Sequence, residues 1–110
     1  MKKILFSVLE RGNATDELYS DIIDSGYNGT LIKTQSLKHV LHNDSFKAVL
    51  SLSQIAEDTH EAGQNATIFV IVEEEKLEAL KEMIRSHTDN FSTIHGAMFV
   101  LPIDEFEGSF

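Results

Sequence analysis

The sequence contains no cysteine, a single proline and half as many basic as acidic residues. The lack of cysteine excludes disulfide bonds, thiolate metal sites and cysteine nucleophiles. Nine Lys and Arg against 18 Asp and Glu give a formal net charge of −9, whereas nucleic acids and anionic membranes are usually bound by clustered Lys and Arg. We therefore expect no nucleic-acid partner and no binding to an anionic membrane surface.

Long hydrophobic runs are also missing. A membrane-spanning helix needs roughly 18 or more apolar residues, and no segment of the chain approaches that length. The opening MKKILFSVLERG combines two lysines with a short apolar stretch, as a signal peptide does, but it runs into Glu10 and Arg11 without a small-residue cleavage site. We interpret it as a first strand and expect a cytoplasmic protein with no membrane span.

The 110 residues fit one domain, 1–110. Apolar runs predict strands at 2–9, 30–34, 65–72 and 97–101, the last of them ended by Pro102. Helix signals predict one helix from about residue 15 to Gly26 and a second over 73–87. The order strand, helix, strand, strand, helix, strand predicts an α+β, ferredoxin-like βαββαβ fold, a four-stranded antiparallel sheet with two helices on one face.

In such a fold one face of the sheet has no helices over it. Strand residues alternate between faces, and in the first, third and last strands both sets of alternate residues are apolar. Because the helices bury only one set, the other would form a large exposed apolar patch. The sequence therefore predicts self-association through the sheet.

A long central loop, at about 35–64, separates the second and third strands. Alternation on both sides of Asn43 and Asp44 favours a protruding hairpin, while a rough apolar stripe over 45–56 supports a helix instead. Its histidines, His39, His42 and His60, raise the alternative of a metal site, but they lack HxH or HxxxH spacing and we predict no metal.

Three segments resemble the PII-like signal proteins, a family of trimeric ferredoxin-like domains: MKKILFSVLE at the start, SGYNGTLIKT at the second strand and GAMFVLPIDEF at the last strand. The resemblance implies a homotrimer that binds a small molecule in clefts between subunits. The family places such a ligand beside the base of the central loop and the loop before the last strand. The residues at those positions here are Gly29, Thr30, Thr34, Gln35, His95 and Gly96.

The chain departs from the nucleotide-binding members in its charges. Those members have a glycine-rich loop with a lysine before the last strand and arginines after it, whereas this chain has His95, Gly96 and Ala97 before it and acids after Pro102. The cyclic di-AMP receptor branch is similar in its threonines, at Thr30 and Thr34, and in the closing FVLP. The resemblance therefore predicts the fold more specifically than the ligand, and Gly29 and Gly96 have the alternative role of shaping turns.

No nucleophile motif and no phosphate-binding loop is present, so we predict a protein that is not an enzyme and has no cofactor. The main hypothesis is a regulatory protein whose ligand, a nucleotide in the family it resembles, orders the central loop. The loop's apolar residues would then contact a protein partner: Leu37, Val40, Phe46 and Leu50. The alternatives are a cyclic di-AMP receptor and a structural or metal-binding trimer without nucleotide.

Overall fold

The structure is a computed structural model, and it describes residues 1–36 and 64–109. The predicted hairpin or helix of the central loop lies outside these residues. So do the partner-binding residues predicted for that loop and its three histidines. No helix in the described part of the chain is long and apolar enough to cross a membrane.

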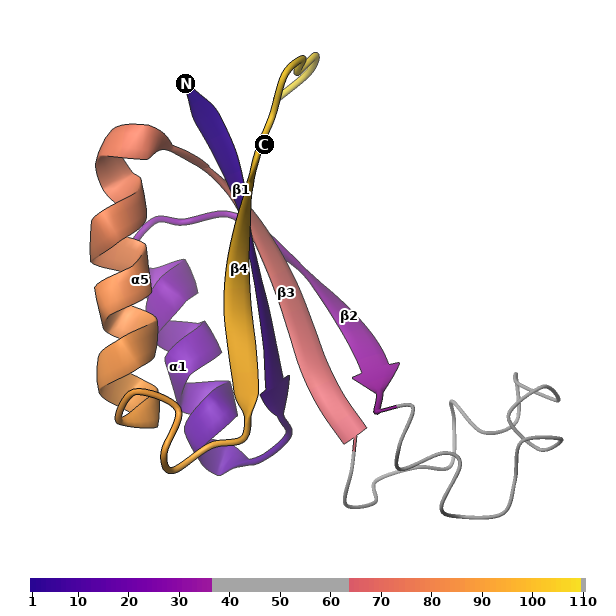
Figure 1. Ribbon diagram of the computed structural model, residues 1–110, viewed down its shortest axis with the longest axis vertical. Helices are drawn as coiled ribbons and strands as arrows, with labels where there is room; N and C mark the ends of the chain where they lie inside the picture. The colour runs from indigo at the N-terminus through magenta and orange to yellow at the C-terminus, as the bar shows by residue number, and fades with distance from the viewer. Residues whose placement is uncertain (37–63, 110) are drawn as a thin grey trace, which may run out of the picture.

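Six elements follow one another along the chain: β1 (Lys2–Glu10), α1 (Asn13–Asp24), β2 (Gly29–Gln35), β3 (Gln64–Glu73), α5 (Glu74–Thr88) and β4 (Gly96–Pro102). The strands form one sheet in the order β2-β3-β1-β4, and every neighbouring pair is antiparallel. Both helices lie on the same side of this sheet (Figure 1). The predicted α+β, ferredoxin-like arrangement is therefore confirmed.

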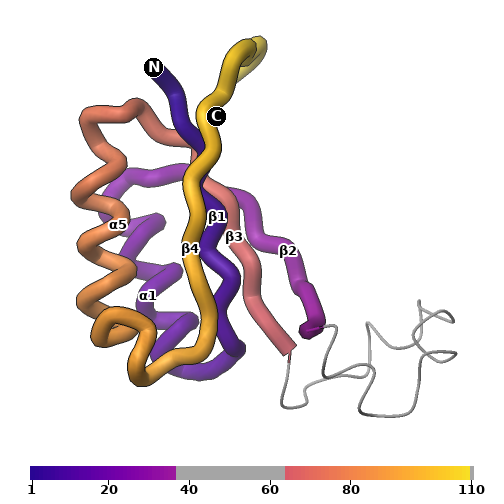
Figure 2. Tube along the Cα trace, in the orientation of Figure 1, coloured from indigo at the N-terminus to yellow at the C-terminus, as the bar shows by residue number. Residues whose placement is uncertain are grey.

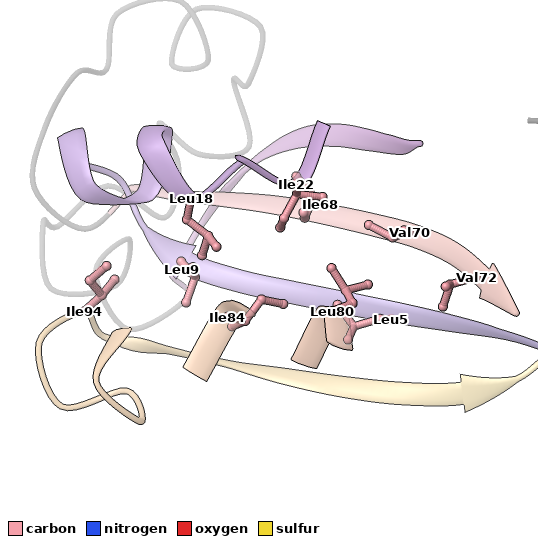
Figure 3. Packing of buried hydrophobic residues seen from close by; sticks show 10 residues of the cluster. All are labelled: Leu5, Leu9, Leu18, Ile22, Ile68, Val70, Val72, Leu80, Ile84 and Ile94. Atoms are coloured by element: carbon pink, nitrogen blue, oxygen red, sulfur yellow. The ribbon is translucent and has the colours of Figure 1, made fainter. Parts of the chain in front are cut away.

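The core lies between the helices and one face of the sheet. Leu5 and Leu9 of β1 and Val70 of β3 are fully buried on that face, because alternate residues of a strand point the same way. Leu18 and Ile22 of α1 and Leu80 and Ile84 of α5 complete the cluster from the helix side (Figure 3). At roughly 1.5 to 3 kcal/mol for each fully buried aliphatic side chain, this layer supplies most of the driving force for folding.

The start of α1 differs from the prediction made from the sequence, whereas its end agrees with it. The helix begins at Asn13 with Gly12 as its N-cap, two residues before the predicted start. Thr15 is buried, and its hydroxyl donates to the carbonyl of Glu10 at 2.7 Å, so it ties the helix to β1 rather than capping it. At the other end, where the sequence predicts that the helix stops, Gly26 has a left-handed backbone, with φ of 94°.

The face of the sheet away from the helices, which we call the open face, is apolar. At its centre the Phe6 ring lies 5.0 Å from that of Phe99 and 5.8 Å from that of Phe69, measured between ring centroids. Phe99 and Leu101 are each 48% exposed in the single chain. The helices therefore leave a continuous apolar surface uncovered, as the alternation predicts.

Candidate functional site

The candidate residues of β2 lie on both of its faces and at both of its ends. Thr30 pairs with Phe69 and lies on the open face, whereas Gly29 pairs with the core residue Val70. Thr34 also lies on the open face, where its Oγ1 is 2.8 Å from Oγ1 of Thr67. β2 thus brings two hydroxyl-bearing side chains to the open face, four residues apart.

Gln35 closes β2 opposite Gln64, where the central segment leaves and re-enters the sheet. Gln35 faces the same, helix-covered side of the sheet as Gly29, because the two residues are six positions apart in one strand. Gly29 and Gln35 therefore mark opposite ends of the strand, and only Gln35 and Thr34 border the central segment.

The other two candidates lie at the start of β4. Gly96 pairs with Leu9, and the carbonyl of His95 accepts a hydrogen bond from the Glu10 N–H at 2.8 Å. β4 and β2 are the two edges of the sheet, with β1 and β3 between them. Three strand spacings separate them, about 14 Å. The two groups of candidate residues therefore do not meet within the single chain.

Packing alone explains why residue 96 is a glycine. Its φ is 153°, and a Cβ at this position would lie 2.1 Å from the Val8 carbonyl oxygen and 2.9 Å from Cα of Leu9. No side chain fits in that space. The glycine is required by the close approach of β4 to β1, so it gives no independent support for a ligand.

The sequence interpretation overlooked Arg11 as a neighbour of this site. Its Nη1 donates to Oε1 of Gln64 at 2.9 Å, and its backbone N–H donates to the Gln64 carbonyl at 3.1 Å. The guanidinium therefore lies at the end of the sheet where β1 ends, beside the re-entry of the central segment. In the sequence, the only sign of this role was a single arginine after the first strand. Its partner Gln64 is distant in sequence, so the contact could not be predicted.

The most strongly shifted titratable group among the described residues is Tyr19. Burial raises the pKa of its hydroxyl to about 12, and a hydrogen bond with the Ser7 side chain partly opposes that shift. The hydroxyl donates to the carbonyl of Ala66 at 2.8 Å. A phenol held protonated between β1 and β3 joins the helix to the sheet, and it is poorly suited to transfer a proton near neutral pH.

A cavity of about 430 Å³ lies at the opposite end of the sheet from Thr34 and His95. Lys2, Tyr27, Glu73 and Phe106 are part of its lining, and none of the predicted site residues is. Nζ of Lys2 is 2.6 Å from the Glu73 carboxylate, and that hydrogen bond holds the pKa of Glu73 below its usual range. Lys2 also lies over the Phe106 ring, 5.2 Å from its centroid.

No group of three or more potential metal ligands occurs within residues 1–36 and 64–109. The three histidines that suggest a metal site are outside those ranges. The charged clusters within them are surface ion pairs such as Arg85 with Glu78 and Glu82 on α5. Such exposed pairs contribute little to stability.

No protein-family model and no curated protein sequence matches the chain. Solved structures do match it. A functionally unknown protein from Pediococcus pentosaceus is 18% identical, with a TM-score of 0.60, and the match covers 98% of this chain and 97% of that one. Arabidopsis thaliana PII bound to citrate is 13% identical, also with a TM-score of 0.60, over 93% of this chain and 77% of that one.

The periplasmic divalent cation tolerance protein CutA from Archaeoglobus fulgidus is 11% identical with a TM-score of 0.55, and the match covers 97% of this chain and 88% of that one. At these identities the likeness concerns the fold, which agrees with the resemblance of the three sequence segments. The strand order, the two helices on one face and these neighbours together give the chain the ferredoxin-like fold of the PII-like proteins.

Proposed function

We propose that the protein is a non-enzymatic, PII-like regulatory protein that assembles as a homotrimer through its open face. The apolar open face supports assembly, because a surface built around Phe6, Phe69 and Phe99 is costly to leave in water. In the proposed trimer the open faces of the three chains cover one another.

A small molecule, a nucleotide in the first instance, binds between neighbouring subunits in this proposal. The observation that carries it is the position of the candidate residues on the two opposite edges of one sheet, at β2 and β4. Assembly brings Thr30, Thr34 and Gln35 of one chain to His95 and Gly96 of the next. Hydroxyl and amide groups suit the edge of a base, and Arg11 is the nearby cation in this part of the chain.

Bound ligand then orders the central loop for a protein target, with Leu37, Val40, Phe46 and Leu50 as the contact residues. A cyclic di-AMP receptor is the first alternative. A structural or metal-binding trimer without nucleotide is the second, and the likeness in fold to the divalent cation tolerance protein is the observation that favours it.

The test is thermal unfolding of the purified protein with ATP, ADP, AMP, cyclic di-AMP or zinc, with the mass in solution measured on the same sample. A ligand at a hundredfold excess over its Kd stabilises the native state by about 2.7 kcal/mol. We expect one nucleotide to raise the Tm and Thr30→Val to reduce that rise. Ser86→Ala, which removes an exposed hydroxyl on α5, is the matched control.

The outcomes separate the hypotheses. A trimer with no shift for any nucleotide would overturn the sensor and leave a structural trimer. A shift with zinc alone would favour the metal-binding alternative, and a shift with cyclic di-AMP alone would favour the receptor alternative.

A further inference from the structure

At the end of the sheet beside the central segment, the open face is polar, unlike its aromatic centre. The strand registers place four side chains there in one row across the sheet: Thr34 of β2, Asn65 of β3, Glu10 of β1 and His95 just before β4. Asn65 pairs with both Thr34 and Glu10, and the Glu10 N–H donates to the His95 carbonyl at 2.8 Å. Figure 1 shows the ends of β1 and β2 and the starts of β3 and β4 together at this end.

Glu10 and Asn65 are not among the residues that the sequence predicts for the site. Glu10 follows the buried Leu9 and Asn65 precedes the buried Ala66, whose side chains face the helices, so both polar residues point to the open face. Directly opposite residues of an antiparallel pair have Cβ atoms about 5 Å apart. A carboxylate and an amide therefore fill the interval between the two groups of candidate residues.

The fold makes no use of the Glu10 carboxylate. The hydrogen bonds of this residue come from its backbone, because its N–H donates to the His95 carbonyl and its C=O accepts from the Thr15 hydroxyl at 2.7 Å. The side chain is exposed and forms no ion pair with residues 1–36 or 64–109. These backbone contacts do not require an acid at this position.

The charge at this end of the open face is negative. Lys33 of β2 pairs with a buried alanine of β3 and therefore faces the helices, and the two lysines of β1 lie at its opposite end. Arg11 donates to Gln64, which also lies on the helix-covered side, and β3 and β4 contain no base. Glu10 thus has no base beside it on this face among the four strands. A phosphate over it would be repelled, whereas an N–H donor would be favoured.

The row therefore has a defined hydrogen-bonding character. An ionised carboxylate only accepts hydrogen bonds, whereas the amide of Asn65 and the imidazole of His95, on either side of it, can donate. Adenine presents the complementary pattern, an amino donor next to a ring-nitrogen acceptor. A base with an oxo group in place of the amino group would direct one acceptor at another.

We propose that Glu10 is the specificity-determining residue of the ligand site, and that its carboxylate selects a base with an exocyclic amino group over the same base with an oxo group. Asn65 and His95 supply the donors for the neighbouring ring nitrogen. The inference rests on the proposed function, because it assigns the base-recognising residue of that same site.

The experiment measures Kd by isothermal titration calorimetry of the full chain with three pairs of ligands: ATP and inosine triphosphate, AMP and inosine monophosphate, and cyclic di-AMP and cyclic di-IMP. The two members of each pair differ in the amino group, which is an oxo group in the inosine compound. In the pair that binds, we expect the adenine compound to bind about tenfold more tightly, as a base-edge contact typically provides.

Glu10→Gln should bring the two Kd values of that pair close to each other, because an amide donates to an oxo group as readily as it accepts from an amino group. The variant keeps both backbone hydrogen bonds of the residue, so its Tm without ligand should equal that of the unchanged protein. Glu75→Gln, which removes an exposed acid from α5, is the matched control and should keep the tenfold preference.

The outcomes distinguish this inference from the proposed function. Equal affinities within a pair, or the same preference in Glu10→Gln as in the unchanged protein, would overturn the inference and leave the nucleotide sensor in place. If none of the six compounds binds, the sensor itself is overturned and the inference with it. A Glu10→Gln protein with a different mass in solution would assign the acid to assembly, which also overturns the inference.

Discussion

At the scale of single residues, packing requires glycine at some positions and not at others. Gly96 and Gly12 provide the contrast. A Cβ on Gly96 would overlap the backbone of β1, whereas a Cβ on Gly12 meets no atom within 4 Å. Gly12 also has an extended backbone, with φ of 167°, that any residue adopts.

We therefore expect Gly96→Ala to lower the free energy of unfolding by several kcal/mol, about 2 to 4, because β4 must move away from β1. Gly12→Ala should cost less than about 1 kcal/mol, the cost of replacing an N-cap glycine. Urea denaturation measures both. Equal losses for the two variants would show that β4 adapts to a side chain at position 96.

His87 is a second residue whose surroundings determine its chemistry. Its Nδ1 lies 3.0 Å from the carbonyl of Met83 and its Nε2 lies 2.8 Å from the carboxylate of Asp21 on α1. Both neighbours accept hydrogen bonds, so the doubly protonated ring suits this position. The Met83 carbonyl, followed by Asp21 and the charge of Glu17, raises the pKa of His87 above its usual value of 6.5.

A pKa raised by folding stabilises the protein fully below pH 6.5, and this contribution is lost as the pH rises through the folded-state value. We therefore expect the Tm to fall as the pH rises above 6.5, and the fall to be smaller in Asp21→Asn. An NMR titration of the His87 ring should give a pKa above 6.5 that moves toward 6.5 in this variant. Asp24→Asn, on the same helix, is the control, and a ring that titrates at or below 6.5 would contradict the assignment.

At the scale of elements, the turn after α5 has an unusual backbone. Asp89, Asn90 and Phe91 all have left-handed conformations, with φ of 49°, 56° and 64°. Such a run is unfavourable for residues other than glycine. Buried Thr88 holds it in place, because its Oγ1 donates to the Ile84 carbonyl at 2.8 Å and accepts from the Phe91 N–H at 3.0 Å.

Thr88→Val, which keeps the shape and removes the hydroxyl, should lower the free energy of unfolding by about 1 to 3 kcal/mol, since the Phe91 N–H loses its partner. Thr88→Ser keeps the hydroxyl and should cost about 0.8 kcal/mol, the value of one buried methyl group. Thermal and urea unfolding provide the comparison. If serine costs as much as valine, the methyl group and not the hydroxyl holds the turn.

The strands were predictable because apolar runs end at strong local signals. β1 ends at Glu10, β3 at Glu73 and β4 at Pro102, each within a residue of its predicted end. α1 begins at Asn13, two residues before the predicted start, and the Thr15 hydroxyl bonds to a strand carbonyl from within the helix. The site was less predictable, since its residues lie on opposite edges of the sheet and come together only in the proposed trimer.

At the scale of the whole molecule, the open face is the surface on which the proposed trimer depends. Its apolar side chains come from all four strands, and those on β4 are half exposed in the single chain. Within the helices and strands that the structure describes, the large apolar side chains exposed on the helix side are Ile23 of α1 and Leu31 of β2. The two surfaces are therefore separable by mutation.

We expect the purified protein to have three times the 12.3 kDa mass of the chain in size-exclusion chromatography with light scattering. Leu101→Glu should shift it toward the single-chain mass, because a charge on the open face opposes burial. Leu31→Glu introduces the same charge on an exposed strand leucine of the helix side and should leave the mass unchanged. A trimer that tolerates Leu101→Glu would place the contact elsewhere.

The start of β1 and the end of β4 lie together at one end of the sheet, and the Ile103 N–H donates to the Lys2 carbonyl at 3.2 Å (Figure 2). Thr34, Gln35 and His95 lie at the other end. Because the chain has no cysteine, a cysteine introduced at Ser109 would be its only thiol and could be coupled selectively. A sensor chip or a single-molecule tether coupled there would hold every molecule in one orientation, with the candidate site facing the solution.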